Sequence, residues 1–339
     1  MTMSGLTNVT GHADAEPSMG LLCQDPDRAA TPPDRRCRVL VTAQSVAGSP
    51  AAIAMIEAAG HEVIVRQTPL PVDEAWLSGQ VRDADRSERN ETVQRTLRIM
   101  LESAEAAERD EHFVCSDAGI PVFFVRVGTQ ARFAGSVRQA ITDGFANLVR
   151  TISPPLLPHV THPLTGARGY QGKGMPIVTF DLVDDGDFVD ITCSAKALGS
   201  GRWAALEIFS SPDLHAIERF VLETVLRAGS QPCPPVVIAV GIDGTFDYAA
   251  KLAKEATLRP IGTAHGEPEA AAMERRLLDA VNQTGFGPMG TGGDSSAMAV
   301  HVDYAAGHGF TPVAVAFNCW INRRTRARLY NDDRVETID

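Results

Sequence analysis

Residues 231–260 read QPCPPVVIAVGIDGTFDYAAKLAKEATLRP, and this stretch predicts a strand, a tight turn and a helix. The run 236–240 is short, apolar and β-branched, which is typical of a buried strand. A GIDG turn follows, and Thr245 is suited to cap a helix that runs to about Leu258, with small apolar side chains on one face. Cys233 therefore lies just before a strand that leads into a helix N-terminus.

The turn GIDGTF matches neither of the common phosphate-binding loops. A P-loop needs Gly-Lys-Ser/Thr after the turn, and the dinucleotide fingerprint needs G-x-G-x-x-G. Free backbone N–H groups at the start of the predicted helix still offer a place for an anion. A tight turn without a ligand is the alternative, and the turn alone does not decide between them.

The composition is that of an acidic globular protein. The chain has 339 residues, 44% of them hydrophobic, and a net charge of −11, which predicts one large domain or two smaller ones. The negative charge argues against nucleic acid and against an anionic membrane surface as partners. No apolar run is long enough to cross a bilayer, and no signal-peptide pattern is present, so a cytoplasmic location is expected. The six cysteines are then expected to be free or to bind metal.

The sequence pattern divides the chain into four segments. Residues 1–36 are polar and lack periodicity, and they are predicted to form a disordered tail. Residues 37–80 contain two apolar strands around a capped helix, which predicts a parallel β-α-β piece of unknown role. Residues 81–330 form the main predicted domain, and residues 331–339 are a polar tail.

The N-terminal piece gives one alternative class of protein. Its run VLVTAQSVAGSPAAIAMIEAAGHEVIV resembles the opening unit of the D-2-hydroxyacid dehydrogenases. A nicotinamide-dependent dehydrogenase needs a dinucleotide fingerprint downstream, and the sequence contains none. The segment is therefore interpreted as structural.

Three separated runs each carry one cysteine. They are CSDAGIPVFFV at 115–125, the PCPP run with its strand and helix at 231–260, and GFGPMGTGGDSSAMAVHVDYA with FTPVAVAFNCWINRR within 285–324. In this order they resemble the motifs of the class I (iron–sulfur) fumarase and L-tartrate dehydratase family, in its alpha-type domain. The resemblance extends over about residues 87–328.

The resemblance implies a fold, a cofactor and a reaction. The implied fold is α+β, with mixed and antiparallel sheets and flanking helices. Cys115, Cys233 and Cys319 are implied to hold a [4Fe-4S] cluster whose fourth iron is open and acts as a Lewis acid. The implied enzyme is a hydro-lyase that reversibly removes water from a 2-hydroxy dicarboxylate of the fumarate/malate or tartrate type. Spacing alone does not identify a metal site, because the three cysteines are far apart and no C-x₂-C pair anchors them.

The same resemblance assigns roles to residues near the cysteines. Asp117 matches an aspartate of the first motif and is expected to transfer a proton at the leaving oxygen, with a turn-capping aspartate as the alternative. Ser116 stands where the family has glutamine and is expected to contact substrate. His308 matches a family histidine near the substrate, although a lone histidine is often structural. Three alternatives are open for Arg323 and Arg324. They offset the negative charge of the cluster, they bind a substrate carboxylate, or they lie on the surface and bind a partner.

A long loop supplies further candidates for substrate binding. Residues 153–174 are rich in Pro, Gly and basic groups, and irregular loops of this length are often functional. Arg168 and Lys173 are expected to bind a substrate carboxylate, with solvated surface charge as the alternative.

The run CSAKALGSGRW at 193–203 corresponds to the family's glycine-rich KGGGSEN-type loop. Gly199 is the substrate contact that this correspondence implies. Gly201 and Arg202 replace the family's Glu and Asn, so the contacts of the loop differ here. Cys193 is extra to the implied cluster ligands and is expected to be a packed or spare thiol.

Single-chain members of the family carry a second domain after the alpha-type domain. This chain ends soon after its third motif, so it is expected to be the alpha subunit of a two-subunit enzyme. A separate beta subunit would then carry the rest of the active site, in an α₂β₂ assembly. The alternative is a non-catalytic cluster-binding or assembly subunit, which the replacements at Ser116, Ala118, Gly201 and Arg202 motivate.

Overall fold

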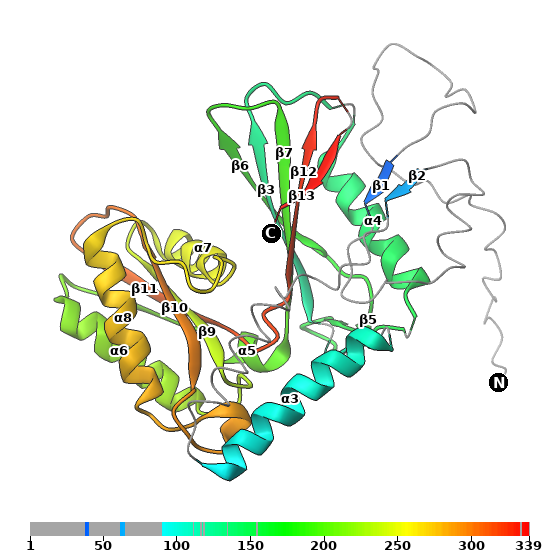
Figure 1. The fold of residues 1–339 in the computed structure, drawn as a ribbon. Helices are drawn as coiled ribbons and strands as arrows, with labels where there is room; N and C mark the ends of the chain where they lie inside the picture. Colours follow the sequence, from blue (N-terminus) through cyan, green and yellow to red (C-terminus); the bar gives the residue numbers. More distant parts are fainter. Residues whose placement is uncertain are drawn as a thin grey trace, which may run out of the picture.

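The computed structural model describes residues 38–40, 62–64 and 90–338, apart from positions 111, 116, 118, 134, 154 and 333. Two larger sheets, each with its own helices, make up most of this part, and Figure 1 shows them as two halves of the molecule. Among the helices in these ranges, none combines the length and apolar character needed to cross a membrane.

The larger sheet has five strands in the order β13-β12-β7-β3-β6. In chain order the strands are β3 (Ile120–Gly128), β6 (Ile177–Val183), β7 (Phe188–Lys196), β12 (Arg324–Tyr330) and β13 (Val335–Thr337). Only β3 and β6 pair in parallel, so the sheet is mixed. Helix α4 (Val137–Thr151) covers it by packing Val137 and Ile141 on Phe123 and Val125.

The second sheet has four strands in the order β10-β9-β11-β8, with β9 and β10 parallel and the other pairs antiparallel. The strands are β8 (Ala205–Phe209), β9 (Val236–Ile242), β10 (Ala297–Tyr304) and β11 (Thr311–Asn318). Helices α6 (Leu214–Ala228) and α8 (Pro268–Asn282) cover one face and form the main core with it, whereas α7 (Phe246–Ala256) packs on the other face. The predicted α+β class, with mixed sheets and flanking helices, is confirmed.

The strand, turn and helix predicted from residues 231–260 are present as β9, its turn and α7. Thr245 takes the N-cap position of α7, but its side chain makes no capping hydrogen bond. Gly241 lies where α7 crosses β9, and a Cβ there would lie 2.0 Å from the carbonyl oxygen of Ala249. The helix can therefore lie this close to the strand only because that position is glycine.

Smaller elements connect these layers. They are α3 (Glu91–Arg109), α5 (Leu198–Arg202), the 3₁₀ turn η1 (Pro288–Gly290), and the short strands β4 (Val160–Thr161) and β5 (Arg168–Gly169). In the view of Figure 1, α3 runs below both sheets from the η1 turn toward β5. Near the N-terminus β1 (Arg38–Leu40) and β2 (Glu62–Ile64) pair in parallel, as the β-α-β prediction expects. The helix predicted between them and the tail predicted at 1–36 lie outside the described residues.

A buried carboxylate ties β7 to β12. Asp190 is 2% exposed, and its carboxylate accepts hydrogen bonds from the guanidinium groups of Arg328 at 2.6 and 2.9 Å and of Arg326 at 2.7 Å. Burial raises the pKa of Asp190, but the hydrogen bonds and charges of Arg328 and Arg326 outweigh it and hold the pKa below its ordinary value.

Replacing this carboxylate by an amide is expected to destabilise the five-stranded sheet. Asp190→Asn should lower the free energy of unfolding at pH 7 by roughly 1.5–3 kcal/mol, the range for hydrogen bonds to charged groups. Because the folded-state pKa is lowered, the wild type keeps this advantage above about pH 4 and loses it as the pH falls through that pKa. Urea unfolding between pH 7 and pH 3 measures the difference, and the exposed Asp185→Asn is the control. Equal stability of Asp190→Asn and wild type at pH 7 would contradict the expectation.

Candidate functional site

The pairing of β9 with β11 brings two of the three predicted cysteines together. Cys233 precedes β9 and Cys319 follows β11, and these strands run antiparallel with Asn318 opposite Val237. Both cysteines therefore lie at the same edge of the four-stranded sheet. The backbone N–H of Trp320 donates to the carbonyl oxygen of Cys233 at 3.1 Å, which joins the two loops directly.

Cys115 joins them from the loop between α3 and β3. All three thiols are free and partly buried, and they pack against one apolar group. That group consists of Val93, Leu97 and Met100 on α3 together with Trp320 and Ile321. Burial is the main cause that raises the pKa of Cys233, and the neighbouring Cys319, Cys115 and Asp117 raise it further. Cys319 and Cys115 are thus close enough to Cys233 to affect the pKa of its thiol.

Cys115, Cys233 and Cys319 have the chemistry that an iron–sulfur cluster requires of its ligands. In the described residues, no group of three or more His, Cys, Asp or Glu side chains is arranged to hold a metal ion. A cluster makes a different demand, because each thiolate binds a different iron and the ligands surround the cluster rather than meet at one point. Three thiols gathered in one group are soft ligands of the kind that suit such a cluster, so the residues present fit it.

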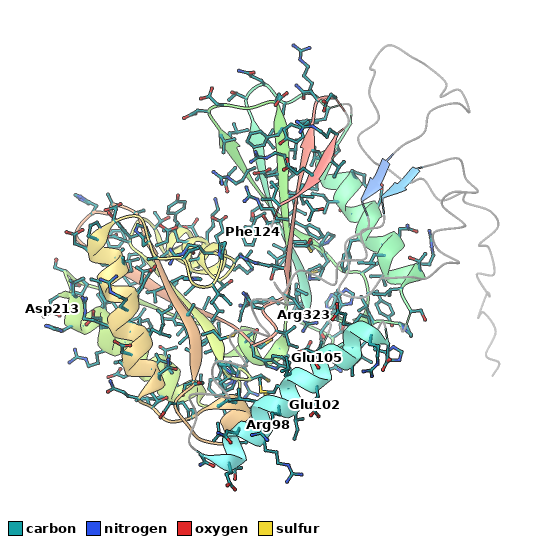
Figure 2. The ribbon with its side chains drawn as sticks, in the orientation of Figure 1. Arg98, Glu102, Glu105, Phe124, Asp213 and Arg323 are labelled. Atoms are coloured by element: carbon teal, nitrogen blue, oxygen red, sulfur yellow. The ribbon has the colours of Figure 1, made fainter. Side chains whose placement is uncertain are left out.

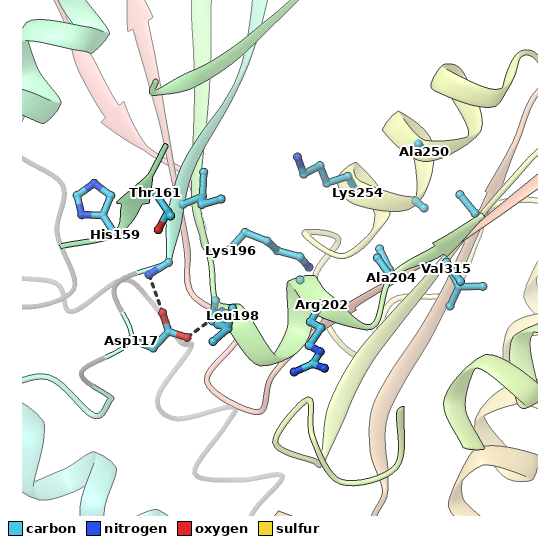
Figure 3. A pocket seen from close by; sticks show the side chains of 18 of the residues that line it. Asp117, His159, Thr161, Lys196, Leu198, Arg202, Ala204, Ala250, Lys254 and Val315 are labelled. Carbon is cyan, nitrogen blue, oxygen red and sulfur yellow. Dashed lines mark hydrogen bonds between the residues drawn. The ribbon is translucent and has the colours of Figure 1, made fainter. Parts of the chain in front are cut away.

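Asp117 is fixed beside these thiols by the backbone. Its carboxylate oxygens accept hydrogen bonds from the N–H of Gly119 at 3.1 Å and of Leu198 at 2.8 Å (Figure 3). Its own N–H donates to the sulfur of Cys115 at 3.4 Å. Gly119 has φ of +70°, and a Cβ there would lie 2.6 Å from the carbonyl carbon of Lys196. The glycine therefore lets the Asp117 loop lie against the end of β7.

Next to Asp117 lies a pocket of about 1040 Å³ between the two halves of the molecule (Figure 3). Of the charged lining residues within the described ranges, Asp117 is the one carboxylate, and four are basic: Arg168, Lys196, Arg202 and Lys254. The rest of the lining is largely apolar and includes Ala250, Ala253, Ala314 and Ala316. A pocket with this excess of positive charge, in a chain whose net charge is −11, is suited to an anionic ligand.

Lys196 lines this pocket and also bonds to Asn318, the residue before Cys319. Its ammonium donates to the carbonyl oxygen of Phe317 and to the side-chain oxygen of Asn318, the latter at 2.8 Å. Burial lowers the pKa of Lys196 to about 7, while Cys319 raises it and Lys254 lowers it. Burial also lowers the pKa of Lys254. Both lysines extend into the pocket in Figure 3.

The structure brings together only some of the predicted substrate-binding residues. Arg168 lines the pocket. Lys173 is exposed and is not among the described residues that line it. A Cβ on Gly199 would lie 2.6 Å from the carbonyl oxygen of Gln231, so this glycine packs α5 on the loop before Cys233 and does not face the pocket. Ser116 lies outside the described residues, and its role stays a prediction.

His308 lies away from the cysteines. It is exposed in the loop before β11, whereas Cys319 follows that strand, so the two residues lie near opposite ends of β11. His308 is not among the described residues that line the pocket. The predicted contact between His308 and substrate therefore stays a prediction. His301, in contrast, is 1% exposed and lies in the core within β10.

Among the described residues that line the pocket, four with ionisable side chains were not predicted as site residues from the sequence: Lys196, Lys254, His159 and Arg202. For Lys254 a signal was present, because Ala250, Ala253 and Lys254 lie at the i, i+3, i+4 spacing of one helix face. That spacing predicts a shared face but not the pocket that the face borders.

Two residues near the site, Arg323 and Cys193, lie away from the protein surface. Arg323 is 5% exposed, and the hydroxyl of Ser194 donates to its carbonyl oxygen at 3.0 Å (Figure 2). The interpretation of Arg323 as a surface residue that binds a partner is therefore wrong. Cys193 packs with the core on the α4 side of the five-stranded sheet, and burial raises the pKa of its thiol to about 12. It stays apart from the three grouped cysteines, as expected.

Comparisons with known proteins agree with this arrangement. Residues 68–328 match the family described as fumarate hydratase (Fumerase). The putative L(+)-tartrate dehydratase subunit alpha of Methanocaldococcus jannaschii is 33% identical over 273 residues, which cover 78% of this chain and 94% of that protein. The L(+)-tartrate dehydratase subunit alpha of Escherichia coli strain UTI89 is 33% identical over 279 residues, which cover 80% of this chain and 89% of that protein. The protein of the same description from strain K12 is 32% identical over the same length.

Proposed function

Because the chain belongs to the alpha-subunit family of the class I fumarase and tartrate dehydratase hydro-lyases, we propose that it removes water reversibly from a 2-hydroxy dicarboxylate, using a [4Fe-4S] cluster held by Cys115, Cys233 and Cys319. Family membership implies an iron–sulfur cofactor in general. The observation that carries the finer proposal is that three thiols gather against one apolar group beside Asp117, a fixed carboxylate that lines a basic pocket. The proposed place of action is the cytoplasm, where thiols stay reduced.

The proposed chemistry divides between the cofactor and the chain. A cluster with three protein ligands supplies an open iron as a Lewis acid for the leaving hydroxyl. Asp117, oriented by two backbone N–H groups, holds or delivers the proton at the leaving oxygen. Arg168 and Lys196 provide positive charge for the substrate's carboxylates. The N–H of Asp117 donates to the sulfur of Cys115 and so helps to orient that ligand.

The partner proposed for this chain is a separate beta subunit. The relatives named above are described as alpha subunits, which implies such a partner. We place its contact at the apolar rim of the pocket, where Leu198 is 75%, Leu157 54%, Leu206 41% and Ile120 39% exposed although all four line the cavity. The beta subunit would close the pocket, exclude water and add the catalytic base, in an α₂β₂ assembly.

The subunit proposal is tested by assaying the purified alpha subunit with and without its beta subunit, anaerobically, on malate and L(+)-tartrate. Adding the beta subunit is expected to raise turnover roughly 10²–10⁴-fold, the range for a positioned general acid or base. Leu198→Glu should weaken subunit association, because it puts a charge on the apolar rim. Leu164→Glu is the matched control, since Leu164 is 89% exposed and is not among the described residues that line the pocket.

Full turnover by the alpha subunit alone would contradict the role of the partner. No turnover by the assembled, cluster-loaded complex on any hydroxy dicarboxylate would favour the non-catalytic alternative. One observation gives that alternative some weight: Gly201 and Arg202, which replace the family's Glu and Asn, both line the pocket.

A further inference from the structure

The two lysines of the pocket differ in what holds their ammonium groups. Two of the three N–H donors of Lys196 have protein acceptors, in Phe317 and Asn318. Lys254 also faces the pocket, but no hydrogen bond or ion pair joins its ammonium to another described residue. Both ammonium groups lie in one cavity, and Lys254 is near enough to Lys196 to lower its pKa.

Two lysines of α7, Lys251 and Lys254, differ in whether an anionic side chain neutralises them. Lys251, about one turn earlier, forms ion pairs with Asp181 on β6 and with Glu255. Lys254 is partly buried in the last turn of the helix, where the backbone dipole alone favours a cation. That stabilisation is modest, and a partly buried ammonium without an anion is costly. The position therefore favours an anion, and the described part of the chain supplies none to the Lys254 ammonium group.

Figure 3 shows the charged side chains that would surround such an anion. Asp117 and Lys254 stand on opposite sides of the pocket, with Lys196 between them. Asp117 lies beside Cys115, so the reacting end of a substrate belongs on that side. A second carboxylate, farther along the same molecule, would then lie toward Lys254. Arg202 extends from α5 in another direction and does not share this corner of the pocket.

We propose that Lys254 binds the substrate carboxylate remote from the cysteines and so selects dicarboxylates over monocarboxylates. This inference rests on the proposed function for the direction in which substrate lies. Lys254 is then a substrate-binding residue that determines specificity. The helix that carries it, α7, packs on β9 at Gly241.

The test measures binding of succinate and of butyrate, a matched pair without a hydroxyl to eliminate, to the cluster-loaded complex of alpha and beta subunits. Lys254→Met is expected to weaken succinate binding about 10- to 100-fold by calorimetry, because one charge-assisted contact is lost, and to leave butyrate binding unchanged. Lys254→Arg should restore much of the affinity for succinate. Lys251→Met, on the same helix but outside the pocket lining, is the control and should bind both acids as the wild type does.

A purely structural role for Lys254 gives a different pattern. Lys254→Met would then lower the thermal midpoint of the complex while succinate bound as to the wild type, and this result would overturn the inference. If the wild type dehydrates hydroxy dicarboxylates and Lys254→Met still binds succinate normally, the inference fails and the proposed function stands. If succinate binding depends on Lys254 but the wild type turns over no hydroxy dicarboxylate, the subsite stands and the proposed function fails.

Discussion

Serine at any one of Cys115, Cys233 or Cys319 is expected to remove the cluster and abolish turnover. A serine hydroxyl is a much poorer ligand for iron than a thiolate, and each cysteine would hold a different iron, so losing one leaves the cluster with two protein ligands. After anaerobic reconstitution, we expect about four irons per wild-type chain, with absorbance near ~400 nm, and close to none in each variant.

Cys193 provides a control within the same chain. Its thiol is packed in the core on the α4 side of the five-stranded sheet, away from the other three, and burial raises its pKa to about 12. Cys193→Ser should cost about 1 kcal/mol of stability for the buried hydroxyl and keep the full iron content. Wild-type iron in Cys115→Ser, or iron loss in Cys193→Ser alone, would contradict the assignment of ligands.

The grouping of these cysteines was accessible from the sequence only through resemblance. Composition and spacing leave the three thiols scattered, because what unites them is long-range: the antiparallel pairing of β9 with β11 and the return of the chain from α3 to β3. Local patterns did predict the parts, including the strand at 236–240 and the helix after it. Their arrangement around one apolar group follows from tertiary packing, which the local pattern does not encode.

His308 and Cys319 show how distance along the chain differs from distance in space. His308 lies close to Cys319 in sequence, but the segment between them is the extended strand β11, of eight residues. At about 3.3 Å per residue, such a strand separates its two ends by roughly 25 Å. Lys254 shows the converse, because a helix places it on the same face as Ala250 and Ala253, and only the fold of the other half of the molecule turns that face into a pocket wall.

Asp117→Asn is expected to lower turnover roughly 10²–10⁴-fold while the cluster and the fold remain. The amide keeps the shape of the side chain but cannot transfer the proton at the leaving oxygen. It can still accept one of the two hydrogen bonds now made by Gly119 and Leu198, so the loss of stability should be only about 1 kcal/mol. Steady-state kcat, iron content and thermal midpoint of the assembled complex are the three measurements.

Capping and catalysis make opposite predictions for this carboxylate. If Asp117 only caps its turn, the substitution leaves kcat nearly unchanged, since an amide also caps, and the thermal midpoint falls only by the loss of one hydrogen bond. Asp213→Asn is a matched control, because Asp213 accepts from the N–H of Ala216 as the N-cap of α6, where asparagine caps equally well. That variant should keep both stability and kcat. If Asp117→Asn lowers kcat while iron content and succinate binding stay unchanged, the loss lies in proton transfer and not in cluster assembly, substrate binding or folding. An unchanged kcat would show that Asp117 takes no part in the reaction.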